Sequence, residues 1–384
     1  MSEVFKAGPV PKTWLGRHRV LSPNAGVRVS PVCLGAMSLT NTWEGFMGKS
    51  DDPYKILDAF FEQGGNFIDT ANVYQSEESE KVIGSWMEQR GNRDQMVIAT
   101  KYSAGYRSYK RDKEPIQSNF TGNSVKAMHV SVRDSMKKLK TEYIDILYVH
   151  WWDSVTSVEE IMRGLHSLVM AGKILYLGAS DFPAWVVMKA NSYARQHGLT
   201  PFSLYQGKWN AGYRDMEAEV IPMCRDQGMA IVPWEALGTG KFLSKEQREA
   251  KKGGRIYGPP AEEALKVSEK LETISQRENT TVQAVALAYL LQKTPYVFPM
   301  VGTRTVEHVK VLEDGLKIAL SKKDLEFIED AIPFNPLFPM TFLYTFGGDR
   351  KYSVGLTPAD NFQYRMASFM DSPDHQPPVK PSNE

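Results

Sequence analysis

Phe67-Ile-Asp-Thr-Ala-Asn-Val-Tyr74 joins a short apolar run to an acidic residue and a tyrosine within one loop. Two later apolar runs also end on polar side chains, residues 96–101 on Lys101 and residues 144–150 on His150. Four polar groups at the carboxyl ends of three apolar runs need a fold that brings those ends together. A parallel α/β barrel does so, because its strands end at one face and its catalytic residues come from several strand ends.

Strand-like and helix-like segments alternate along most of the chain. Strands are predicted at residues 29–35, 67–70, 96–101, 144–151, 174–180, 203–206, 229–234 and 297–302. Helices are predicted after Asp52-Pro53 and the Ser157 capping box, and over residues 79–87, 124–139, 185–197, 216–227 and 281–292. Eight such strand–helix units predict an α/β fold, a closed (β/α)8 TIM barrel rather than an open sheet.

We expect residues 1–384 to form a single barrel domain. Residues 1–28 are an N-terminal lead-in, residues 29–332 the barrel and residues 333–384 a C-terminal loop and tail. Long loops at the barrel mouth are predicted at residues 41–50 and in a Gly-rich insertion at residues 238–262, since loops of that length are usually lids or binding loops. Another capping box begins at Ser321 and predicts a final helix. The aromatic part of the tail is expected to pack over a barrel end, and the last dozen residues to be disordered.

The composition is that of an ordinary globular protein. Of the 384 residues, 42% are hydrophobic and 24% charged. A net charge of +1 gives no field to attract nucleic acid or an anionic membrane. No apolar run approaches the roughly 20 residues that span a bilayer, and the N-terminus lacks the pattern of a secretion signal. Cys33 and Cys224 have apolar neighbours and are expected to be buried free thiols in a reducing, cytoplasmic compartment.

The four polar groups suit general acid catalysis. A tyrosine with a pKa near 10 is a weak acid at neutral pH, and an ammonium group such as Lys101 beside Tyr74 should lower that pKa. Asp69 would hold the lysine in place, and His150 would orient a carbonyl oxygen. Each residue alone has a plain structural interpretation, a solvated rim lysine or a hydrogen-bonded core histidine. Their joint appearance at successive strand ends favours a catalytic site, and without a strong nucleophile acyl transfer is not indicated.

The arrangement resembles the aldo-keto reductase family. The motif from Phe67 to Tyr74, followed by Lys101 and by Leu147-Tyr-Val-His150, is similar to that family's catalytic tetrad in order and spacing. The resemblance covers roughly residues 25–330. Within the family, residues 204–210 and 233–242 are most similar to the fungal aryl-alcohol dehydrogenases and norsolorinic acid reductases.

This resemblance implies hydride transfer from NADPH to the carbonyl of an aromatic aldehyde or a polyketide ketone, and a place in secondary metabolism. Tyr74 would donate the proton, Lys101 and Asp69 would adjust the pKa of Tyr74, and His150 would bind the substrate carbonyl. The implied cofactor residues are Ser180, Asp181 and Gln206 for the carboxamide, Trp234 for the nicotinamide ring, Leu237, Gly238, Gly240 and Lys241 for the pyrophosphate, and Gly302, Thr303, Arg304, His308 and Arg255 for the rest of the dinucleotide.

Two positions depart from the family pattern. Asp181 stands where many relatives have asparagine, which changes an amide contact to a carboxylate contact. Val311 and Leu312 stand where adenine contacts are usual, which puts the preference for NADPH over NADH in question. The substrate pocket is expected to be aromatic, with walls from Trp43, Phe46, Tyr102, Trp151, Trp152 and the C-terminal segment.

Two other classes of protein remain open from the sequence. The β subunits of voltage-gated potassium channels are similar barrels that sense a nucleotide and regulate a partner, but an intact tetrad favours catalysis here. A metal-dependent barrel hydrolase would need His-x-His pairs at strand ends, and the sequence has none, so no metal is expected. The exact substrate, the direction of the reaction and the oligomeric state are not predicted.

Overall fold

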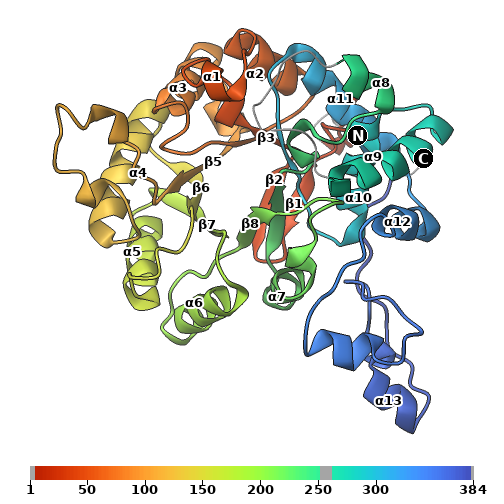
Figure 1. Ribbon diagram of the computed structural model, residues 1–384. Helices are drawn as coiled ribbons and strands as arrows, with labels where there is room; N and C mark the ends of the chain where they lie inside the picture. The colour runs from red at the N-terminus through yellow and green to blue at the C-terminus, as the bar shows by residue number, and fades with distance from the viewer. Residues whose placement is uncertain (1–4, 251–261, 382–384) are drawn as a thin grey trace.

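A closed barrel of parallel strands forms the centre of the molecule (Figure 1). The computed structural model describes residues 5–250 and 262–381. Over these residues one sheet has the order β10-β3-β4-β5-β6-β7-β8-β9. Its strands are β3 (Cys33–Gly35), β4 (Phe67–Asp69), β5 (Val97–Tyr102), β6 (Ile144–Val149), β7 (Ile174–Ser180), β8 (Leu204–Lys208), β9 (Ala230–Trp234) and β10 (Met300–Gly302). A parallel bridge between Ile231 and Val297 joins the two edges, so the predicted barrel is confirmed.

Helices surround the barrel and cover the outer face of the sheet (Figure 1). They are α2 (Pro53–Glu62), α3 (Glu78–Arg90), α4 (Val125–Leu139), α5 (Val158–Met170), α6 (Ala184–Gln196), α7 (Val220–Gln227), α10 (Val282–Lys293) and α11 (Val306–Lys317). Further helices are α1 (Glu44–Met47), α8 (Lys245–Ala250), α9 (Glu262–Arg277), α12 (Lys322–Glu329) and α13 (Phe362–Ala367). Among the described helices, none combines the length and the apolar content that crossing a bilayer requires.

The helix starts follow the predicted capping signals. Asp52 accepts a hydrogen bond from the Tyr54 amide at the start of α2, with Pro53 in the first turn. The Ser321 capping box is complete at the start of α12. At Ser157 only half of the predicted box forms, because Glu160 accepts instead from the Val125 amide, 3.0 Å away. That carboxylate therefore caps the neighbouring helix α4.

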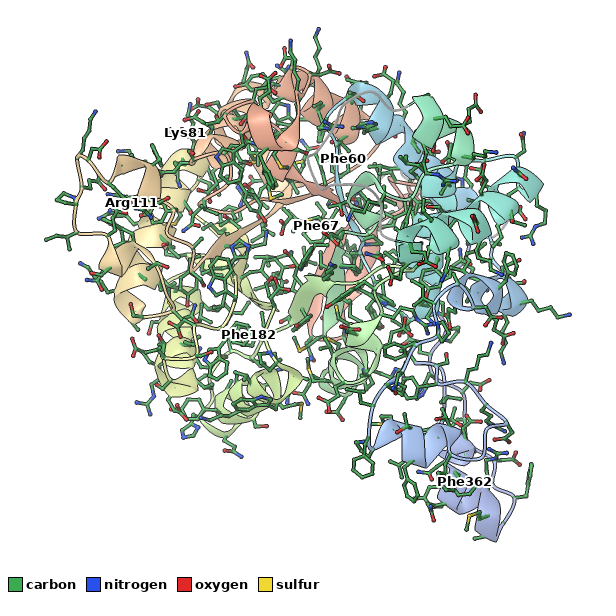
Figure 2. The ribbon with its side chains drawn as sticks, viewed as in Figure 1. Phe60, Phe67, Lys81, Arg111, Phe182 and Phe362 are labelled. Atoms are coloured by element: carbon green, nitrogen blue, oxygen red, sulfur yellow. The ribbon has the colours of Figure 1, made fainter. Side chains whose placement is uncertain are left out.

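Two apolar cores lie on the two faces of the sheet. Side chains alternate between faces along a strand, so Phe67 points into the barrel while Ile68 faces the helices. Figure 2 shows Phe67 near the barrel centre. A hairpin of β1 (Arg19–Ser22) and β2 (Ala25–Val29) closes the amino-terminal end, where Leu21 and Val29 pack with the barrel interior. Cys33 and Cys224 are buried free thiols, as predicted.

The C-terminal segment differs from the prediction. Its aromatic part projects away from the barrel beyond α12 (Figure 1) instead of packing over a barrel end, and aromatic rings there pair with one another, as Phe346 does with Phe362 at 5.2 Å. Residues 373–381 have no regular secondary structure but are bound to the rest of the chain. His375 donates to the Leu356 carbonyl at 3.0 Å and Lys380 to the Leu320 carbonyl at 2.7 Å. Side-chain to backbone hydrogen bonds thus order a stretch whose sequence has little apolar content.

Helices α3 and α4 approach closely at Gly84, and this contact provides a test of how the helices pack around the barrel. A Cβ atom at residue 84 would lie 2.3 Å from the Lys138 carbonyl oxygen, which belongs to the backbone and cannot rotate away. We expect Gly84→Ala to lower the free energy of unfolding by about 1–3 kcal/mol, measured by chemical denaturation. Helix propensity alone predicts the opposite sign, a gain of roughly 0.5–1 kcal/mol. The control is Gly45→Ala in α1, where no atom lies within 4 Å of the added Cβ; equal effects would contradict the contact.

Candidate active site

A buried ion pair between Lys101 and Asp69 lies inside the barrel at the carboxyl ends of β5 and β4. Both side chains are fully buried. The Lys101 ammonium donates to Asp69 Oδ1 and, at 2.8 Å, to the Thr70 carbonyl. The second oxygen, Asp69 Oδ2, accepts from Gln206 Nε2 at 2.9 Å. Burial raises the pKa of Asp69 and by itself lowers that of Lys101, but Asp69 keeps the pKa of Lys101 above its usual value.

The Tyr74 ring lies beside this pair. Lys101 Nζ is 5.0 Å from the centroid of the Tyr74 ring, and the tyrosine is 9% exposed. Burial raises the pKa of Tyr74, and Asp69 raises it further, whereas Lys101 lowers it. Lys101 thus acts in the predicted direction, but the net pKa of Tyr74 lies above the ordinary value. Desolvation, which the sequence does not reveal, outweighs the ammonium, and Tyr74 stays a neutral phenol.

His150 completes the cluster from the end of β6. Its ring meets the Tyr74 ring edge-on with centroids 6.0 Å apart, and it lies 4.6 Å from the Trp151 ring. Burial lowers the pKa of His150 well below its ordinary value, and Lys101 lowers it further. The imidazole is therefore neutral near neutral pH. Its Nδ1 is buried and has no hydrogen-bond partner among the described residues, which suits a ligand that brings one.

The residues predicted to hold the nicotinamide end form one hydrogen-bonded chain. Ser180 of β7 pairs with Gln206 of β8 in the sheet. The Asp181 amide donates to the Gln206 carbonyl at 3.0 Å, and the Asp181 carboxylate accepts from Trp234 Nε1 at 3.0 Å. Because Gln206 also donates to Asp69, the chain connects Trp234 to the ion pair. Burial raises the pKa of Asp181, while Trp234 and Lys101 lower it.

The predicted pyrophosphate loop forms a tight turn. Gly238 and Gly240 have φ angles of 61° and 75°, which glycine adopts without strain. Three of the amides expected to face a phosphate are engaged within the turn itself. Gly238 donates to the Glu235 carbonyl, Gly240 to that of Leu237 and Lys241 to that of Gly238. These three amides are therefore not available to a phosphate in this conformation, because the turn satisfies its own donors.

A cavity of about 460 Å³ lies against this turn. Besides the predicted Gly238 and Lys241, its lining includes Lys208, Asn210 and Tyr213, which sequence reasoning missed. Lys208 Nζ lies 3.2 Å from Glu235 Oε2 and 4.3 Å from the Tyr213 ring centroid. A signal was available, because Lys208 is a basic residue at the end of a strand, as Lys101 is near the end of β5.

Arg304 and His308 lie together where α11 begins. The Arg304 amide donates to His308 Nδ1 at 3.3 Å, and one guanidinium nitrogen of Arg304 donates to the Met47 carbonyl at 3.2 Å. Within the described part of the chain Arg304 has no carboxylate partner, so its charge is available to an anion. Burial lowers the pKa of His308, and Arg304 adds to this. Gly302 and Thr303 precede this pair, and the buried Thr303 hydroxyl also lacks a partner among the described residues. Arg255 falls outside those residues.

Two of the aromatic residues expected at the substrate pocket lie elsewhere. Tyr102 is fully buried in the core between sheet and helices, and its hydroxyl donates to the Asn123 carbonyl at 3.4 Å. Since Lys101 points into the barrel, its neighbour must face the helices, so the substrate-binding prediction for Tyr102 is wrong. The Trp152 ring packs edge-on against the Trp185 ring of α6, with the ring centroids 5.5 Å apart. Trp152 therefore packs against the helices outside the barrel.

Three predicted wall residues do stand where a ligand can reach them. Trp151 is 39% exposed beside His150, and Phe46 on α1 is 48% exposed. Trp43 is held by its indole nitrogen, which donates to Ser76 Oγ at 3.1 Å, and its amide donates to Gln75 Oε1 at 2.7 Å. The segment that begins at Trp43 is thereby tied to the loop that carries Tyr74.

The chain is similar to known proteins over most of its length. The chain matches the aldo/keto reductase family model over residues 31–333. The chain belongs to the aldo/keto reductase family. It is 47% identical over 380 residues to norsolorinic acid reductase A of Aspergillus parasiticus, covering 98% of this chain and 97% of that protein. It is 50% identical over 365 residues to an aryl-alcohol dehydrogenase (NADP(+)) of Phanerodontia chrysosporium, covering 91% and 94%. The predicted resemblance to this part of the aldo/keto reductase family is confirmed.

The neutral state of His150 predicts a pH effect on this aldo/keto reductase. Its pKa in the folded protein lies below the usual 6.5, whereas in the unfolded chain the imidazole binds a proton below about pH 6.5. The unfolded state then binds more protons, so stability falls as the pH drops below that value. We expect His150→Gln to reduce this loss between about pH 7.5 and 5, by up to ~1.4 kcal/mol per pH unit, in urea denaturation. The control is His129→Gln, which removes an exposed imidazole; an unchanged slope for His150→Gln would contradict the assignment.

Proposed function

We propose that this protein is an NADPH-dependent reductase that transfers hydride to the carbonyl of an aromatic aldehyde or a polyketide ketone. The observation that carries the proposal is the buried Lys101–Asp69 pair beside the Tyr74 phenol and the neutral His150 imidazole. The aldo/keto reductase membership of the chain supports the reaction class. Two relatives, named norsolorinic acid reductase and aryl-alcohol dehydrogenase, support an aromatic substrate.

Tyr74 acts as the general acid in this proposal. Its raised pKa keeps the phenol protonated at neutral pH, so it holds the proton that the carbonyl oxygen needs. As hydride reaches the carbonyl carbon, charge develops on the oxygen and the proton leaves the phenol. The fixed positive charge of Lys101 then stabilises the phenolate that remains. Asp69 and Gln206 hold that ammonium in place, because it has no room to move in a fully buried site.

His150 orients the substrate. A neutral imidazole can donate one hydrogen bond to the carbonyl oxygen without competing for its proton. The lowered pKa of His150 keeps the imidazole neutral at neutral pH, where the raised pKa of Tyr74 keeps the phenol protonated. The edge-on contact between the two rings supports a role for both residues at one carbonyl group.

The predicted residues fit a dinucleotide along the carboxyl ends of the strands. NADPH would supply the hydride. Gln206 and Asp181 offer acceptor oxygens for the carboxamide, and Trp234 offers a ring face for the nicotinamide. Arg304 offers an uncompensated charge at a helix start, where an anion is favoured. The buried Thr303 hydroxyl, which has no partner among the described residues, fits a ligand atom nearby.

The alternative function is a nucleotide-sensing regulatory subunit without turnover. Both functions predict NADPH binding, so only catalysis separates them. The test adds veratraldehyde to purified protein with NADPH and follows the loss of NADPH absorbance, with hexanal as the aliphatic control. Faster loss with veratraldehyde is expected. Tight NADPH binding without oxidation for any aryl aldehyde or anthraquinone ketone would favour the regulatory function.

Replacing the proton donor tests the role of Tyr74. We expect Tyr74→Phe to lower kcat by about 10²–10⁴-fold, the usual contribution of general acid catalysis, while the Kd for NADPH changes little. The matched control is Tyr102→Phe, which removes a buried hydroxyl that faces the helices. Steady-state kinetics and fluorescence titration measure the two quantities. A comparable loss of kcat in both variants, or a parallel loss of NADPH binding in Tyr74→Phe, would contradict the assignment.

Arg304 is expected to select the cofactor by its extra phosphate. We expect Arg304→Ala to raise the KM for NADPH by roughly 10–100-fold, the loss of one charge-assisted contact, and to leave the KM for NADH nearly unchanged. Lys317→Ala, at the other end of α11, is the control. The ratio of kcat/KM for the two cofactors is measured for each protein. A ratio equal to that of the wild type would show that Arg304 does not read the phosphate.

A further inference from the structure

A separate cavity of about 470 Å³ lies at the amino-terminal end of the barrel, and we call it the basal cavity. It is lined by residues within the ranges 14–20, 291–298 and 376–380, and by Leu316. The Ile231 amide, at the start of β9, donates to the Tyr296 carbonyl at 2.9 Å. The basal cavity therefore lies where the strands begin, whereas Tyr74 and His150 lie where they end.

The basal cavity is strongly positive. Arg17, His18, Arg19 and Lys380 line it, and no acidic residue does. Among the described residues, the buried Arg17 Nε atom has no hydrogen-bond partner, and Arg19 makes no ion pair or side-chain hydrogen bond. Burial alone lowers the pKa of Arg19 to about 10. Two guanidinium groups thus lack the anionic partner that buried charges normally have.

Most of the remaining walls are apolar. Leu291, Leu316 and Phe298 are almost fully buried, and Pro295, Tyr296 and Val379 also line the cavity. The Arg17 guanidinium lies 3.6 Å from the centroid of the Trp14 ring, so stacking orients it. His18 and Lys380 donate to the carbonyls of Gly64 and Leu320, each at 2.7 Å, which anchors the rim.

We propose that the basal cavity binds a small organic anion, a carboxylate or phosphate group carried on a flat apolar body. The anionic group would accept hydrogen bonds from Arg17 and Arg19, which are strong when both partners are charged. The apolar body would lie between Leu291, Tyr296 and Val379. The cavity volume lies within the range of small-molecule sites, roughly 300–1,000 Å³.

The proposal is independent of the carbonyl reductase activity. The cavity shares no lining residue with the cluster of Asp69, Tyr74, Lys101 and His150. An anion bound there joins the N-terminal hairpin, the connection before β10 and the C-terminal tail, which are distant in sequence. Binding should therefore stabilise the folded protein, whether or not the protein reduces carbonyls.

Calorimetric titration of the full chain with naphthoate tests the proposal. We expect binding to weaken about tenfold or more in Arg17→Gln/Arg19→Gln. The matched control is Arg111→Gln/Lys113→Gln, two exposed cations on a loop at the outer edge of the molecule (Figure 2), where binding should be unchanged. Uncharged naphthamide and inorganic phosphate should each bind at least about tenfold more weakly than naphthoate, and naphthyl phosphate shows which anionic group is preferred. Equal affinity of both double variants, or of naphthoate and naphthamide, would overturn the proposal.

A second variant tests the proposal independently, in case the arginine double variant does not fold. Val379→Trp keeps every charge and fills the cavity from its rim, since Val379 is 60% exposed. We expect it to weaken naphthoate binding about tenfold or more; unchanged affinity would place the ligand elsewhere. In addition, Arg19→Gln without ligand should raise the melting temperature, because it removes an unpaired, half-buried charge. A lower melting temperature would assign Arg19 a structural role and contradict the anion site.

Discussion

The interaction on which this structure depends is the buried ion pair between Lys101 and Asp69. A fully buried ammonium or carboxylate is costly alone, and only mutual contact with further hydrogen bonds makes both tolerable. The Thr70 carbonyl, directly after β4, and the Gln206 amide of β8 supply those bonds. The barrel must therefore close before the pair is complete, because its partners come from strands on different sides of the ring. The position of the Lys101 ammonium beside the Tyr74 ring is fixed in the same step.

From this pair the site extends along the carboxyl ends of the strands. Gln206 connects Asp69 to Asp181, and Asp181 connects to Trp234, so the residues proposed to hold the nicotinamide are linked to the ion pair by hydrogen bonds. The carboxylate of Asp181 fits this chain of hydrogen bonds, because the Trp234 indole nitrogen donates a hydrogen bond to it. Such a chain holds its groups in place before any ligand arrives, which is what electrostatic stabilisation of a developing charge requires.

The two ends of the barrel differ in whether their cationic side chains have a carboxylate partner. At the carboxyl end the Lys101 ammonium is in direct contact with the Asp69 carboxylate. The few further hydrogen bonds that the pair requires each have a defined partner. At the amino-terminal end Arg17 and Arg19 stand against apolar walls without a matching carboxylate among the described residues. A protein of net charge +1 has acidic residues enough to pair them. The unpaired state of the basal cavity is thus a local property of the fold, and an external anion would satisfy it.

The sequence by itself determined the barrel, its strand ends and the four residues that meet there, because strand periodicity, helix caps and the spacing from Asp69 to His150 are local properties of the chain. Alternation along β5 would also have excluded Tyr102 from the pocket. Only the tertiary structure decided the raised pKa of Tyr74, the engaged amides of the glycine turn and the basal cavity. Desolvation and pairing depend on which distant segments surround a group. No local pattern records those neighbours, since they are assembled only when the chain folds.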